Sequence, residues 1–208
     1  MVVIGKIVES FSPSADGFGF MWVILAVGGI AAAISVERFL YIVMKSGKGR
    51  KEFMANLSQL LKGDKLAEAT SYAQNKTIPL AKCIYAVLKS RDKGEKGMSD
   101  ALDEVFLTEA PRITRYMNLI VVCANVVTLT GLLGTIYGLI AAFDAVANKP
   151  AAERPTALAN GISVAMGTTF LGLVVAIPLL VVNGYLTLQA TRLVEEMEEK
   201  SLKVMHIL

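Results

Sequence analysis

Two threonines set in regular series of small residues are the side chains of this 208-residue chain that best fit a chemical role. Thr135 and Thr169 each belong to a series spaced three or four residues apart, which places each series on one face of a helix. The first series comprises Gly131, Gly134, Gly138 and Ala142, and the second comprises Gly161, Ala165, Gly172 and Ala176. A threonine hydroxyl in an apolar helix usually bonds to a carbonyl one turn earlier. Two hydroxyls on facing stripes could instead bind a carboxyl group or an ordered water, as a proton path requires.

The small residues themselves have two interpretations. Helices in lipid gain little from hydrophobic contact, so close backbone approach at small residues is a main route to their association. The stripes either pack two helices of one subunit together, or they line a tightly filled interior of an oligomer and contact a partner's helix. The sequence leaves both interpretations open.

A proton path normally needs an acid or a histidine within the membrane as a relay. The nearest acids, Glu37 and Asp144, stand at the ends of apolar runs, and the one histidine, His206, is in the terminal tail. Either the chain moves no protons, or a partner supplies the titratable group. No nucleophile, base and orienting group fall together, and no phosphate loop or metal-ligand cluster is present, so we predict no enzyme activity, cofactor or metal.

The helices that must hold these residues are indicated by the distribution of charge. The chain is 54% hydrophobic, above the roughly 45–50% of soluble domains, and residues 17–36, 117–143 and 156–191 contain no Asp, Glu, Lys or Arg. Each run is long enough to cross a bilayer core as a helix of about 20 residues. The third run is longer than a crossing needs, so its helix should either tilt or continue past the membrane surface, and we favour the second. We expect the second and third helices both to be long and to extend into the cytoplasm.

Basic residues set the expected topology. Fourteen Lys and Arg lie between Lys45 and Arg115, whereas the residues before Gly17 contain only Lys6. The positive-inside rule therefore places the N-terminus outside and the basic segment and C-terminus in the cytoplasm. We expect an all-α membrane protein with a periplasmic segment at 1–17, retained spans at 18–43, 117–143 and 157–190, a cytoplasmic helical domain at 44–116, a short periplasmic loop at 144–156 and a cytoplasmic helix at 191–208. Residues 2–11 fit either a short interfacial helix or an irregular arm.

Turn signals divide the cytoplasmic segment into short helices. Gly63-Asp64 predicts a helix stop followed by a cap, and Ile78-Pro79 predicts a break. Gly94 to Gly97, followed by Ser99, predicts a further loop and N-cap. The two cysteines, Cys83 and Cys123, are interpreted as packing residues.

The string GLLGTIYGLIAAF (131–143), followed by GISVAMGTTFLGLVVAIPLLVVN (161–183), resembles the MotA/TolQ/ExbB proton channel family. The VERFLY run after the first span and GDKLAEA…PLAKCIYAVL in the cytoplasmic segment resemble the same family more weakly. Three spans, with a cytoplasmic segment after the first, favour the ExbB and TolQ branch over four-span flagellar stators.

The resemblance implies a homopentamer around two copies of an ExbD/TolR-like single-span partner, whose membrane helix carries an Asp. Proton passage to and from that Asp is then coupled to movement of the pentamer around the dimer. Thr135 and Thr169 match the family's two pore threonines. Two positions depart from the family pattern: Val164 stands where a Glu is usual, and Val127-Thr128 replaces a common Ala-Pro. The partner's Asp would therefore be the only carboxylate within the membrane.

These features favour a channel subunit of a motor driven by the proton motive force, located in the bacterial inner membrane. The alternative is a non-conducting oligomeric scaffold whose stripes serve only packing. Retention of a single-span partner by the purified oligomer would favour the motor.

Overall fold

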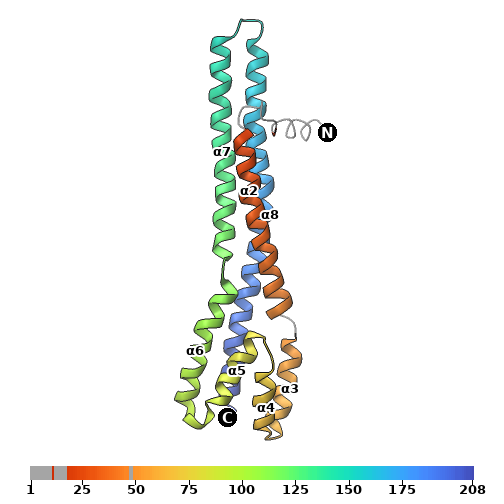
Figure 1. The fold of residues 1–208 in the computed structure, drawn as a ribbon, viewed down its shortest axis with the longest axis vertical. Helices are drawn as coiled ribbons and strands as arrows, with labels where there is room; N and C mark the ends of the chain where they lie inside the picture. Colours follow the sequence, from red (N-terminus) through yellow and green to blue (C-terminus); the bar gives the residue numbers. More distant parts are fainter. Residues whose placement is uncertain (1–10, 12–17, 47–48) are drawn as a thin grey trace. The chain divides into compact units, whose positions relative to one another are not determined.

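The computed structural model describes residue 11, residues 18–46 and residues 49–208, and its regular elements over these residues are all helical (Figure 1). The predictions for residues 1–17 therefore lie outside the described residues, except at Phe11. The described chain divides into two compact units. We call them the membrane unit, which ends at Val36 and resumes from Tyr116 to Gly184, and the polar unit, Glu37–Arg115 and Tyr185–Leu208.

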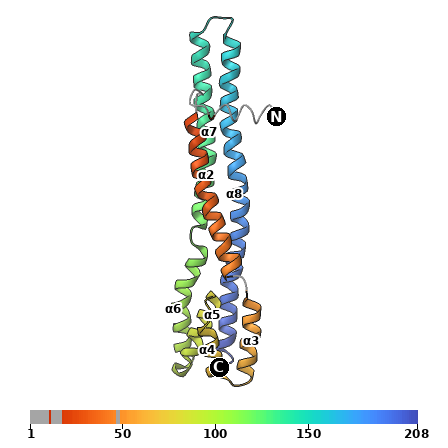
Figure 2. The same cartoon turned by 45° about the vertical axis from the view of Figure 1, so that its right-hand side comes forward.

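The membrane unit is built from three long apolar helices. These are α2 (Phe18–Phe39), α7 (Met117–Asn148) and α8 (Arg154–Met205), of which α2 and α8 also supply residues to the polar unit. Figures 1 and 2 show α7 and α8 side by side, with α2 along them. Their common core consists of Ile24, Ala31, Ile120, Ala124, Val127, Ala176 and Leu179. Each of the three helices contributes to this core, which holds them as one bundle.

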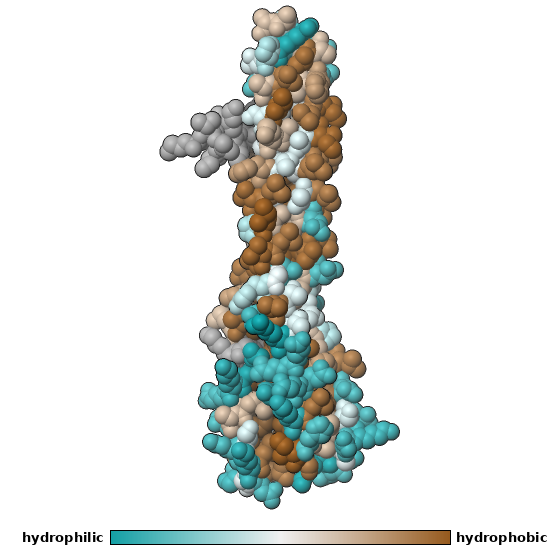
Figure 3. Space-filling view, turned by 180° about the vertical axis from the view of Figure 1, so that it is seen from behind, coloured by the Kyte–Doolittle hydropathy of each residue, from teal (hydrophilic) through white to brown (hydrophobic). Residues whose placement is uncertain are grey.

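Among the described residues, three helices are long and apolar enough to cross a membrane. Many large side chains on their outer faces, such as Leu129, Phe143 and Val181, are more than 60% exposed. Figure 3 shows this hydrophobic surface over the long helices and a largely hydrophilic one elsewhere. Such a surface is stable in lipid and not in water, so the chain is an all-α, multi-pass membrane protein, as predicted.

Helix α8 has 52 residues and stays helical through Pro178. At 1.5 Å per residue it is about 78 Å long, against about 30 Å for a bilayer core. It therefore continues well beyond a membrane, as the long third run predicted. Helix α7 instead begins after a break at Arg115 and Tyr116, where Tyr116 has a φ of 65°.

The polar unit contains short helices packed around the C-terminal part of α8. A π-helical segment, η1 (Leu40–Ser46), follows α2, and α3 (Arg50–Lys62), α4 (Leu66–Gln74), α5 (Pro79–Lys89), the 3₁₀ turn η2 (Arg91–Lys93) and α6 (Gly94–Thr114) come after it. Fully buried side chains from α3, α5 and α8 form its interior, among them Phe53, Leu57, Ile84, Leu193 and Met197. The ring of Phe53 also stacks on that of Tyr72 of α4, with 5.4 Å between centroids.

Two predicted boundaries in the polar unit need correction. The stop at Gly63 is confirmed, but the residue that caps α4 is Lys65 and not Asp64, which has a φ of 55°. The loop predicted at Gly94 to Gly97 is wrong, because α6 begins at Gly94 and runs on through Gly97 and Ser99. The turn lies instead at η2 and Gly94, which has a φ of 74°, a conformation that glycine adopts without steric cost. Burial of neighbouring α6 side chains outweighs the roughly 1 kcal/mol cost of a second glycine in the helix.

Candidate functional site

The two stripes of small residues face each other across α7 and α8 of the same chain. A Cβ placed on Gly138 would lie 2.9 Å from the Cβ of Ala165, and one on Gly131 would lie 3.3 Å from the Cα of Thr169. Gly161 likewise faces Ala142. These separations are closer than ordinary side-chain contacts, so only small residues fit.

We call this contact the α7–α8 seam, and it holds all eight small residues of the two predicted stripes. Seven of them are buried, and Gly161 is partly exposed. The seven are Gly131, Gly134, Gly138, Ala142, Ala165, Gly172 and Ala176. The seam realises the interpretation in which the stripes pack two helices of one subunit. A role for these residues in lining a pore or contacting a partner's helix stays a prediction.

Three threonines place their hydroxyls together in the seam, and we call them the hydroxyl cluster: Thr135 of α7 and Thr168 and Thr169 of α8. The hydroxyls of Thr135 and Thr169 are hydrogen-bonded to each other. The Gly131 carbonyl oxygen lies 3.1 Å from the Thr135 hydroxyl, 3.0 Å from that of Thr169 and 3.3 Å from that of Thr168. The Ala165 carbonyl oxygen lies 2.8 Å from the Thr168 hydroxyl and 3.3 Å from that of Thr135. The predicted proximity of Thr135 and Thr169 is confirmed.

The three threonines differ in burial, and therefore in which groups their hydroxyls can contact. Thr168 is completely buried, and its side chain fills the space in front of Gly134. Thr135 and Thr169 are only half-buried, so a group outside the chain can approach them. Thr168 joins the two threonines that the sequence analysis predicted. Its position four residues before Gly172 was the signal that it shares the buried stripe.

A hydroxyl carries one proton and two acceptor lone pairs, so a pair of hydroxyls can pass a hydrogen bond in either direction. Neither hydroxyl ionises near neutral pH, however, and α7 and α8 contain no acid, base or histidine between Gly131 and Phe143 or between Gly161 and Asn183. The pair can hydrogen-bond a carboxyl group or a water. A titratable group for proton transfer must come from elsewhere.

The other polar groups singled out in the sequence are engaged locally. The Thr128 hydroxyl, at the position where the family often has proline, donates to the Ala124 carbonyl oxygen at 3.0 Å. Asp144 accepts a hydrogen bond from the Asn148 side chain at 3.2 Å, and Glu37 is ion-paired with Arg38. Val164 is half-buried.

Fold and site together define a class: multi-pass α-helical membrane proteins in which two spans meet at a seam containing hydroxyl groups but no charge. Within this class, residues 75–199 match the MotA/TolQ/ExbB proton channel family, and the chain belongs to that family. Membership confirms the resemblance drawn from the two seam sequences. It also places the chain among channel and transport proteins, so the prediction that it is not an enzyme is confirmed.

Relatives from three organisms match most of the chain. It is 27% identical over 194 residues to the biopolymer transport protein exbB1 of Vibrio cholerae, covering 91% of this chain and 85% of the relative. It is also 27% identical over 183 residues to a protein of Methanothermobacter thermautotrophicus named as an ExbB homologue in biopolymer transport. That match covers 88% of this chain but only 63% of the relative, so the chain spans less than two thirds of that protein's length. An ExbB-like protein of Synechocystis is 27% identical over 149 residues, 71% of this chain and 70% of its own length.

Proposed function

We propose that the chain is the channel subunit of an energy-transducing motor driven by the proton motive force. In this proposal several copies surround a single-span, ExbD/TolR-like partner, and ion flow along the α7–α8 seam is coupled to mechanical work on an envelope process. Family membership supports the channel class, and the names of the relatives support a link to biopolymer transport.

The observation that carries the proposal is the half-buried pair Thr135 and Thr169. Their hydroxyls meet between two apolar helices, yet both stay accessible from outside the chain. A carboxylate approaching this pair would exchange its hydration for two hydroxyl groups, which lowers the cost of moving it through an apolar interior. The partner's Asp is the group we place there. Val164 leaves no acid of the chain's own to compete with it.

The assembly we propose is a homopentamer around a partner dimer in the bacterial inner membrane, with the basic segment and the C-terminus in the cytoplasm. One proton crossing 100 mV releases about 2.3 kcal/mol. A large conformational task in the envelope would therefore need several protons.

The experiment has two stages. The tagged chain is purified from its native membrane in mild detergent, and co-purifying proteins are searched for one with a single apolar span containing an Asp. The pair is then placed in vesicles, and proton entry under an imposed potential is followed with a pH-sensitive dye. Partner retention with uncoupler-sensitive entry supports the motor. A stable oligomer that retains no single-span protein contradicts it.

That second outcome would favour a non-conducting scaffold. The seam gives this alternative a specific basis, because its small residues are already buried against each other within one chain. Packing alone would explain them.

A further inference from the structure

The polar unit contains a cavity of about 390 Å³ whose lining is strongly basic. Four cationic side chains, Arg38, Lys82, Arg112 and Arg115, line it together with one acid, Glu109. We call it the basic pocket. Its volume falls in the range of sites for small ligands, about 300–1,000 Å³.

The single acid of the basic pocket is already neutralised by two of the cations. The side chain of Glu109 is 5% exposed and accepts hydrogen bonds from Nζ of Lys82 at 2.8 Å and from the Arg112 guanidinium at 2.9 Å. Both cations remain about half exposed, so their other N–H groups can still reach a ligand. Glu37 adjoins the lining through its ion pair with Arg38, so four positive charges against two negative charges leave an excess of two.

Arg38 is held rigidly at the back of this lining. Its side chain is 7% exposed, it is paired with Glu37, and one guanidinium nitrogen donates to the Arg112 carbonyl oxygen at 3.0 Å. Nε and one Nη of this guanidinium already donate to the two carboxylate oxygens of Glu37, so Arg38 adds a fixed positive charge to the lining and its fork is not open to a ligand.

The first turn of α5 adds to the positive potential. Pro79, the first residue of this 11-residue helix, lines the basic pocket, and Ile78 makes no side-chain cap. The partial positive charge of a helix N-terminus therefore adds to that of the cations.

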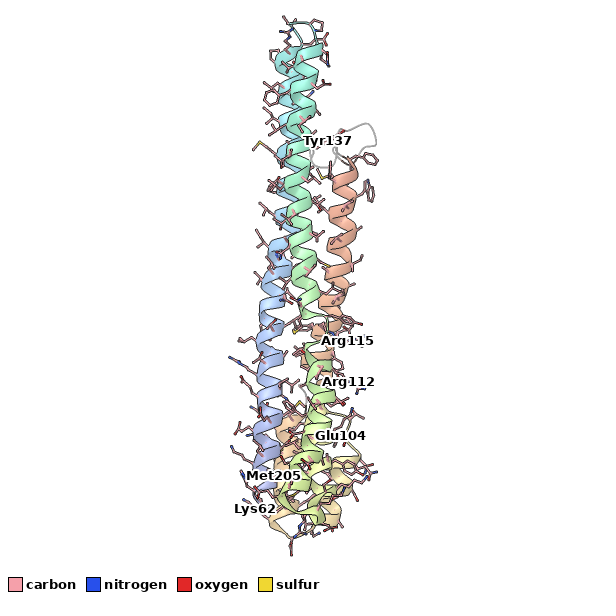
Figure 4. The ribbon with its side chains drawn as sticks, turned by 90° about the vertical axis from the view of Figure 1, so that its left-hand side faces the viewer. Lys62, Glu104, Arg112, Arg115, Tyr137 and Met205 are labelled. Atoms are coloured by element: carbon pink, nitrogen blue, oxygen red, sulfur yellow. The ribbon has the colours of Figure 1, made fainter. Side chains whose placement is uncertain are left out.

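The sequence positions of the pocket residues indicate a membrane boundary. Arg38 follows the first charge-free run by two residues, and Arg115 precedes the second by two. Figure 4 shows Arg112 and Arg115 together near the end of α6. Basic pockets at the cytoplasmic ends of membrane helices suit anionic lipid headgroups.

We propose that the basic pocket binds a phosphate group, carried by an anionic lipid headgroup or present as soluble phosphate. This site is independent of the proposed proton path, because it uses none of the residues of the α7–α8 seam. Occupancy by a lipid headgroup would tie the start of α5 and the end of α6 to the membrane surface.

The test titrates the full-length chain in detergent with phosphatidylglycerol and, separately, phosphatidylcholine, and counts bound lipids by native mass spectrometry. We expect one saturable phosphatidylglycerol per chain and weaker phosphatidylcholine binding. Arg115→Gln should weaken phosphatidylglycerol binding about fivefold, the effect of removing about 1 kcal/mol per basic residue. The matched control is Arg91→Gln, which removes the same charge from an exposed position outside the pocket and should leave binding unchanged.

Inorganic phosphate distinguishes the two sources of the ligand. Displacement of phosphatidylglycerol by millimolar phosphate would identify a site that also takes the soluble anion, and resistance to it would identify the lipid headgroup. Glu109→Gln should tighten phosphatidylglycerol binding, because it removes the only acid of the lining. If Glu109 and Arg115 served only to maintain the fold, Glu109→Gln and Arg115→Gln would both lose binding instead. Equal binding by the native chain and Arg115→Gln, or an equal loss in Arg91→Gln, would overturn the proposal.

Discussion

Replacing Thr169 by valine removes one hydroxyl of the half-buried pair and keeps the shape of the side chain. The Gly131 carbonyl oxygen loses a donor at 3.0 Å but keeps the hydroxyls of Thr135 at 3.1 Å and Thr168 at 3.3 Å. No buried acceptor is left without a partner, so the loss of stability should be close to the average for a hydrogen bond between membrane helices, about 0.6 kcal/mol. The variant should fold and assemble.

The effect on conduction should be much larger. A hydrogen bond to a charged group contributes about 1.5–3 kcal/mol, and its loss at the point of highest energy lowers a rate about tenfold to a hundredfold. We therefore expect Thr169→Val to reduce proton entry by that factor in vesicles that hold the chain with its partner, with the pH-sensitive dye as readout.

The matched control is Thr168→Val on the same helix. Thr168 is fully buried, so its hydroxyl cannot reach a group outside the chain, and proton entry should stay within about twofold of the native value. Undiminished entry with Thr169→Val would refute the assigned role. An equal loss in both variants would show that the seam matters only for packing.

Three further predictions concern stability and reactivity. Gly138→Ala should destabilise the chain by about 2 kcal/mol in a detergent unfolding assay, because its Cβ would lie 2.9 Å from that of Ala165. The control Gly184→Ala meets nothing within 4 Å and should be neutral or stabilising. A larger loss in Gly184→Ala than in Gly138→Ala would contradict the close packing of the seam. Burial, together with the nearby carboxylate of Glu109, raises the pKa of the Cys83 thiol from 9.0 to about 12. Alkylation of Cys83 should therefore be slow at pH 8, and the stability of the fold should decrease as the pH rises above about 9. Rapid labelling of the folded chain at pH 8 would contradict this prediction. Phe53→Ala should cost about 3–5 kcal/mol, measured by thermal unfolding, since this ring is 2% exposed; a loss below about 1 kcal/mol would show that the packing around it is loose.

The membrane helices were readable from sequence because lipid imposes a simple rule. A charged side chain in the bilayer core is costly, so charge-free runs mark the spans directly. Thr135 and Thr169 were also placed correctly, since three- and four-residue spacing fixes a helix face and antiparallel neighbours bring matching depths together. The sequence could not show that the two stripes pair within one chain, because small residues suit contacts within and between subunits equally well.

The polar unit was less predictable, since its elements depend on contacts between distant residues. The glycines Gly94 and Gly97 predicted a loop, but the burial of side chains on α6 stabilises a helix there. The basic pocket joins Arg38 to Lys82 and Glu109, which are more than 40 residues away in the sequence. No local spacing pattern reveals such a cluster, and in the sequence these basic residues indicated only the membrane topology.

The most direct test of the proposed mechanism replaces the intramembrane Asp of the single-span partner by Asn. Proton entry is measured in three sets of vesicles: the chain alone, the chain with the native partner, and the chain with the Asn variant. The seam has hydroxyls but no titratable group of its own, so the account predicts uncoupler-sensitive entry only with the native partner. Equal entry with the Asn variant, or with the chain alone, would contradict it.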